Sequence, residues 1–123
     1  MFAGVTRNIS KQRAQIAVYQ AQLQKEQVEK QLNRDLLNAY DRYKTLFDVY
    51  ELQVQNRQVA SENFKRTNEA YKRGVATTTQ LRESQINQLR ADIAAVQTQF
   101  QLKQSELELR RIAGSLLNKL EVE

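Results

Sequence analysis

The side chains that most often carry catalytic chemistry are missing from this sequence or poorly placed for it. It has no histidine and no cysteine, which removes the commonest general base, the commonest metal ligand and every thiolate. Glu106 and Glu108 are close in sequence, but on a helix they project in different directions. Gly4, Gly74 and Gly114 lie too far apart to form a phosphate-binding loop. The sequence therefore predicts no enzyme, no cofactor and no metal site.

The most informative spacing is that of a predicted turn. Two cations directly precede Gly74, and cations followed by glycine are typical of a helix C-terminus. Val75 can cover the last turn of that helix. Thr77 can cap a following helix, with Gln80 three residues later completing a capping box. The connection is only about three residues long, so the second helix must fold back against the first.

The elements on either side of this turn are predicted to be two very long helices. The chain of 123 residues has no proline, and nothing interrupts a helix from residue 7 to residue 73. The second helix is predicted over residues 78–118, with a tip turn at 74–77 and a frayed tail at 119–123. Residues 1–6 are expected to be the remnant of a strand exit or a disordered lead-in. The fold class is all-α, an antiparallel helical hairpin with arms of unequal length.

Apolar residues recur along both helices at coiled-coil spacing. In the first helix they form a seam that is interrupted by Gln53 and Arg57, together with a second line that repeats every seven residues. In the second helix Lys103 occupies one seam position. Two apolar lines on one helix predict two neighbouring helices. The first seam comprises Ala39, Tyr43, Leu46, Tyr50, Ala60, Phe64, Thr67 and Tyr71; the second line comprises Tyr40, Phe47 and Val54; the predicted seam of the second helix comprises Ile86, Leu89, Ile93, Val96, Phe100 and Leu107.

The predicted arms do not match in length. The first helix is longer than the second by 26 residues, so the start of the first helix has no partner within the chain. Its apolar line, formed by Ala14, Val18, Ala21 and Val28, would stay exposed in a monomer. We therefore expect the chain to associate with itself or with other helices.

The charge pattern argues against nucleic acid as a partner. The net charge is +5, but basic residues alternate with acidic ones along the chain, and a solvated helix surface explains this better than a binding stripe. No stretch is apolar and long enough to cross a bilayer as a helix, and the first residues do not read as a signal peptide. The start at Phe2-Ala3-Gly4-Val5 reads as the continuation of something longer, so we expect a piece of a larger protein.

Three features together resemble the C-terminal repeat of TolC-like outer-membrane efflux proteins. Phe2-Ala3-Gly4 is similar to the strand exit of that family, and residues 70–77 (AYKRGVAT) are similar to its helix-to-helix tip. The alanines 91, 94 and 95, followed by residues 107–114 (LELRRIAG), are similar to its closing helix. Two departures are the lack of a second glycine after Gly4 and the presence of Arg73 where the family has a small apolar residue.

The resemblance implies a role in transport across the periplasm of a Gram-negative bacterium. Proteins of this family are homotrimers with a β-barrel in the outer membrane and a tunnel of long helices in the periplasm. Their helical tips dock to a periplasmic adaptor, which connects them to an inner-membrane transporter. The resemblance leaves the transported substrate open among drugs, metal ions and secreted proteins.

The resemblance also implies functional residues at the tip. Arg73, Gly74, Val75, Ala76 and Thr77 would form the adaptor-docking turn. Three further residues, Tyr71, Gln80 and Glu83, would line the tip aperture, although each also has a structural explanation as a seam, capping or surface residue.

One alternative from another class of protein stays open. The helical hairpin of a periplasmic adaptor, or another coiled-coil scaffold, also buries two seams and ends in a tight tip. Such hairpins usually have arms of similar length and lack a strand exit before the first helix.

Overall fold

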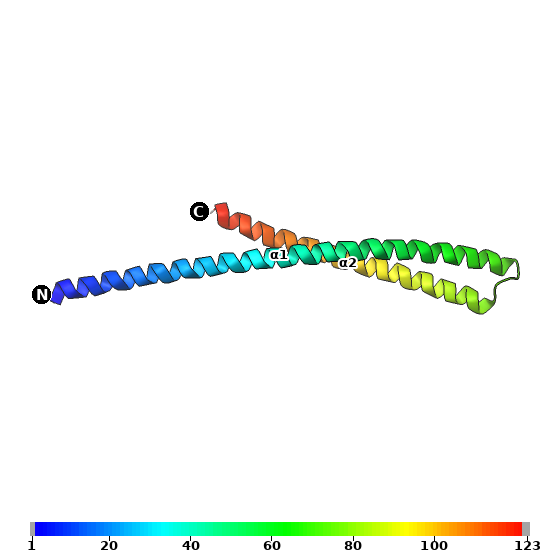
Figure 1. Ribbon diagram of the computed structural model, residues 1–123, viewed down its shortest axis with the longest axis horizontal. Helices are drawn as coiled ribbons and strands as arrows, with labels where there is room; N and C mark the ends of the chain where they lie inside the picture. The colour runs from blue at the N-terminus through cyan, green and yellow to red at the C-terminus, as the bar shows by residue number, and fades with distance from the viewer. Residues whose placement is uncertain (1, 122–123) are drawn as a thin grey trace. The chain divides into compact units, whose positions relative to one another are not determined.

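The computed structural model describes residues 2–121, and these form two α-helices joined by a short turn (Figure 1). Helix α1 spans Phe2–Lys72 and has 71 residues, and helix α2 spans Thr78–Glu121 and has 44. The two helices pack against each other, which confirms the predicted all-α hairpin.

Helix α1 begins earlier, and helix α2 ends later, than the sequence predicts. Residues 2–6 are the first residues of α1 and not a strand remnant or a lead-in, and the hydroxyl of Thr6 donates to the carbonyl of Phe2 at 2.9 Å. The predicted frayed tail is also wrong for residues 119–121, because α2 continues through Gly114 to Glu121. Met1 and residues 122–123 lie outside the described residues. Gly114 does not end the helix, because a glycine costs a helix only about 1 kcal/mol. The burial of nearby Ile112 can offset that cost.

The chain divides into two units near the boundary between Leu37 and Asn38. The first unit contains the N-terminal part of α1, in which every side chain from residue 2 to residue 31 is exposed. We call residues 2–31 the arm. Its apolar residues include Val18 and Val28, both exposed, as the unequal arm lengths predicted.

The second unit is the hairpin, in which residues 38–72 of α1 pack along α2 (Figure 1). The seam predicted for α1 is confirmed in its main part: Tyr43, Tyr50 and Phe64 are half-buried toward α2. Most fully buried residues of α2 are small or hydroxyl-bearing, and Leu102 and Leu109 are half-buried on the same face, so the rings of α1 meet a mixture of small and larger side chains. The buried residues of α2 are Ser84, Ala95, Thr98, Ser105 and Ile112.

The buried hydroxyl groups of α2 are hydrogen-bonded within their own helix. Ser84 donates to the carbonyl of Leu81 at 2.7 Å, and Ser105 donates to that of Leu102 at the same distance. Thr98 donates to the carbonyl one turn before it at 2.8 Å. A buried hydroxyl without a partner would cost about 1–3 kcal/mol, so these bonds allow three hydroxyl-bearing residues within an otherwise apolar seam.

The predicted seam of α2 is wrong for the hairpin. Ile93, Val96 and Phe100, like the other members of that seam, are about half or more exposed. At 100° per residue, the seam that α2 uses lies roughly 150° around the helix from the predicted one. The size of the apolar residues favours the wrong line, because the inward face of α2 combines small residues with Leu102, Leu109 and Ile112 and packs on α1 without its largest side chains. The hairpin thus presents its more apolar helix face outward.

Candidate docking surfaces

The tip is an ordered turn that is built by two capping arrangements. At the end of α1, Gly74 has a positive φ of 78°, a conformation that glycine adopts without a side-chain penalty. The amide of Gly74 donates to the carbonyl of Tyr71 at 3.0 Å, and the amide of Val75 donates to that of Ala70 at 2.9 Å. These two bonds form a Schellman motif, which satisfies carbonyls that the helix end leaves unpaired.

The start of α2 is the predicted capping box. The amide of Gln80 donates to the hydroxyl of Thr77 at 3.1 Å, and the amide of Thr77 donates to the side-chain oxygen of Gln80 at 2.9 Å. Both ends of the connection are therefore fixed by local hydrogen bonds, so the tip keeps one shape without help from a partner.

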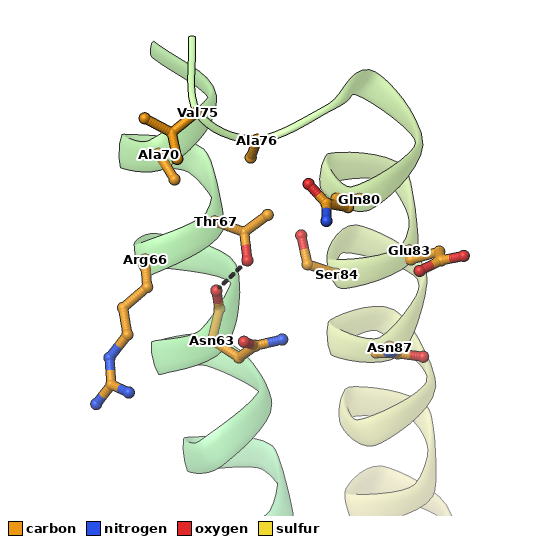
Figure 2. Close-up of a pocket in the computed structure, with 10 residues that line it drawn as sticks. All are labelled: Asn63, Arg66, Thr67, Ala70, Val75, Ala76, Gln80, Glu83, Ser84 and Asn87. Carbon is orange, nitrogen blue, oxygen red and sulfur yellow. Dashed lines mark hydrogen bonds between the residues drawn. The ribbon is translucent and has the colours of Figure 1, made fainter. Parts of the chain in front are cut away.

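Some of the predicted tip residues meet around one hollow, and others do not. Val75, Ala76, Gln80 and Glu83 line an open notch of about 480 Å³ between the end of α1, from Asn63 onward, and the first turns of α2 (Figure 2). Val75 is 80% exposed at the end of the hairpin. The notch is bounded above by the connection between the helices, from which Ala76 points downward in the view of Figure 2.

Arg73, Thr77 and Tyr71 do not line this notch. The guanidinium of Arg73 turns back along α1, with Nη2 at 3.9 Å from the Oε2 of Glu69. The hydroxyl of Thr77 accepts the capping hydrogen bond from the amide of Gln80. Tyr71 is exposed on the last turn of α1, where it belongs to neither the hairpin seam nor the notch.

The walls of the notch also include polar residues that are not among the predicted tip residues. Figure 2 shows Asn63 and Thr67 on α1 facing Ser84 on α2 across the gap. Thr67 donates to the carbonyl of Asn63 at 2.8 Å, so its hydroxyl is paired within α1. Thr67 is a polar residue on the predicted seam of α1. A polar residue in a seam close to the tip is the one sequence signal that indicates a wider gap between the helices there.

The exposed apolar line of α2 is the second surface of note. It runs along the outer face for three heptads, from Ile86 to Leu107, with one cation at Lys103. The second line of α1 is exposed as well: Tyr40, Phe47 and Val54 are each more than 40% accessible. Both helices of the hairpin therefore carry one apolar face that is used within the chain and one that is not.

Several charged groups of the hairpin form ion pairs at its surface. Glu108 accepts hydrogen bonds from Arg111 at 2.6 Å and 3.1 Å, and these bonds lower the pKa of its carboxyl group from 4.5, with a further contribution from the charge of Arg42 on α1. Partial desolvation opposes the shift. Among residues 2–121 no cluster of three acidic side chains could hold a metal ion, and no helix is both long and apolar enough to cross a membrane.

Comparison with known proteins gave no match: no family model, no curated protein and no solved structure is significantly similar to this chain.

Proposed function

We propose that this chain is a wall segment of a closed ring of helices, the periplasmic tunnel of a TolC-like outer-membrane efflux or secretion channel. In this role it acts as a passive conduit. Its tip docks to a periplasmic adaptor, which links the channel to an inner-membrane transporter. The arm and the outer face of the hairpin pack on neighbouring helices of the same channel.

The observation that carries this proposal is the pair of apolar faces on each helix. A free-standing two-helix hairpin needs only one seam for each helix. Here α1 has the exposed line through Phe47 in addition to its hairpin seam, and α2 has the exposed line through Ile93. In a ring, every helix has a neighbour on both sides, and each of these faces acquires a partner.

The tip supports the docking part of the proposal. Its connection is short and held by its own hydrogen bonds, so it presents a fixed surface at little entropic cost to binding. Val75 offers an exposed apolar contact, and the notch beside it offers polar groups on both walls. Such a combination suits the tip of another helical hairpin.

The unequal helix lengths favour a channel segment over the hairpin of an adaptor. Helix α1 has 71 residues and α2 has 44, so the arm needs partners outside the hairpin. The hairpin of an adaptor needs no such arm.

Photo-crosslinking from the tip tests the proposal. The chain, exported to the periplasm of a Gram-negative bacterium with a tripartite efflux system, would carry a photoreactive amino acid at Val75. The control carries the same amino acid at Val59, which is exposed on α1 away from the tip. We expect an adduct with the adaptor from position 75 only. An adduct with the tip of an outer-membrane channel would instead support the adaptor hairpin, and the absence of both adducts would overturn the docking role.

A further inference from the structure

The arm carries an exposed apolar stripe with the same repeat as the outer line of α2. Its large apolar residues are Phe2, Val5, Ile9, Ile16, Tyr19 and Leu23, and all are exposed. Phe2, Ile9, Ile16 and Leu23 are spaced by seven residues, with Val5 and Tyr19 at the intermediate positions. At 100° per residue the stripe is roughly 100° wide, as for a helix that packs on one neighbour.

The two lines match in length and in heptad position. The outer line of α2 has Ile86, Ile93, Phe100 and Leu107 at positions spaced by seven, with Leu89, Val96 and Lys103 between them. Both lines thus span three heptads and end on a leucine, Leu23 in the arm and Leu107 in α2. We propose that the arm of one copy of this chain packs along the outer face of α2 of a second copy, in parallel and in register, so that residue 9 faces residue 93.

Charge favours this pairing over pairing of two arms. The interleaving of charges along the chain does not extend to its first part: residues 2–25 contain four basic residues, Arg7, Lys11, Arg13 and Lys25, and no acidic one. Two arms side by side would therefore bring together two strongly basic helices. Residues 86–107 of α2 contain two basic and two acidic residues and are neutral. Parallel pairing of two α2 lines would also place Lys103 against its own copy.

Charge also sets the orientation. In the parallel register, Arg13 of the arm flanks the seam beside Asp92 of α2, with opposite signs at positions that pair in coiled coils. The side chain of Asp92 is still 39% exposed although it pairs with Arg57. In the antiparallel arrangement Arg13 would flank Arg90 instead. The parallel register pairs all seven positions of the arm line with the seven positions of the α2 line, and the last pair is Leu23 with Leu107. The antiparallel arrangement pairs only six of them and leaves both of these leucines without a partner on the other line.

The pairing covers the apolar stripe of the arm and the outer line of α2, and it needs no other kind of chain. Each copy offers an arm and receives one, which is the self-complementary relation of a symmetric assembly. The inference goes beyond the proposed channel, because it concerns the chain alone and requires neither an adaptor nor a membrane.

Disulfide trapping between separately labelled chains tests the pairing, since the natural sequence has no cysteine. An Ile9→Cys chain mixed with an Ile93→Cys chain is expected to give the mixed dimer in a glutathione redox buffer. Mixing Gln12→Cys with Ile93→Cys, which are neighbours only in the antiparallel arrangement, is expected to give much less. Dominant homodimers of either single variant, or equal yields from both mixtures, would overturn the proposal.

Sedimentation equilibrium provides the second measurement. We expect reversible self-association of the unmodified chain, weakened at least about tenfold by Ile93→Asp, because the new carboxylate would be buried at an apolar seam. The matched control is Gln101→Asp, which adds the same charge at an exposed position off both lines and should change the dissociation constant less than about twofold. A chain that stays strictly monomeric would overturn the proposal. If its arm then bound anionic phosphatidylglycerol vesicles, the partner of the arm would be a lipid surface and not a second copy.

Discussion

The guanidinium of Arg57 on α1 and the carboxylate of Asp92 on α2 form an ion pair across the hairpin, with Nε at 2.8 Å from Oδ1. Arg57 occupies a position on the predicted apolar seam where a charge would ordinarily be costly. It is tolerated because its side chain is 56% exposed and reaches past the seam to its partner. Where the apolar seam is interrupted, this pair therefore links the two helices across the hairpin.

We expect the ion pair to contribute specificity of register more than stability. Both side chains are partly exposed, so a double-mutant cycle with Arg57→Gln and Asp92→Asn should give a coupling free energy of about 0.2–1 kcal/mol. The measurement is urea unfolding of a dilute sample at low and at high salt. The coupling should shrink as salt is added, and a salt-independent value above about 2 kcal/mol would contradict a solvent-screened pair.

Gly74 and Gly114 should respond in opposite directions to a side chain. Gly74→Val should cost at least about 1 kcal/mol of unfolding free energy, because β-branched residues tolerate the left-handed conformation of residue 74 poorly. Gly114→Ala should stabilise the chain by about 0.5–1 kcal/mol, because residue 114 is helical and a Cβ added there would meet no atom within 4 Å. Thermal unfolding followed by circular dichroism measures both. Equal shifts for the two variants would mean that Gly74 is not the cap of α1.

Local signals made the tip and the seam of α1 predictable. Gly74, Thr77 and Gln80 act through hydrogen bonds to residues within a few positions, so their roles can be recognised in the sequence alone. The line through Tyr43 and Tyr50 was recognisable because its members recur at coiled-coil spacing and include large rings that face α2.

The seam of α2 could not be predicted in the same way. Which of its two lines faces α1 depends on the shape of the opposite helix: Ala95 is buried, whereas the larger Val96 and Phe100 stay exposed. The notch walls at Asn63 and Thr67 were missed for a related reason, because a gap between helices follows from how both of them splay. The roles proposed for Tyr71, Glu83 and the docking turn stay predictions.

Glu108 should make a small, acid-sensitive contribution to the stability of α2. Because the Arg111 hydrogen bonds lower its pKa in the folded chain, Glu108 adds stability above the ordinary pKa of 4.5 and loses it as the pH falls through the lowered value. An NMR titration of the Glu108 carboxyl carbon should show a midpoint below 4.5. Arg111→Gln should raise it toward 4.5, whereas Arg110→Gln, which removes a partner of Glu106 at 2.7 Å, should leave it almost unchanged. A midpoint that both variants move equally would point to general charge instead of the hydrogen bonds.

The two faces of α2 can be distinguished by placing the same side chain at adjacent positions. Ala95 is 3% exposed and Val96 is 58% exposed, so Ala95→Phe inserts a ring into the seam and Val96→Phe adds one to the outer face. Overpacking should destabilise the Ala95 variant by about 1–3 kcal/mol. The Val96 variant should change by less than about 0.5 kcal/mol, because Phe100 shows that this face accepts a phenyl ring. Urea unfolding at a dilute concentration, where the outer face is uncovered, measures both. If the Val96 variant were the less stable of the two, the outer line would be the true hairpin seam, and the exposed face on which the ring of helices and the arm pairing depend would lie elsewhere.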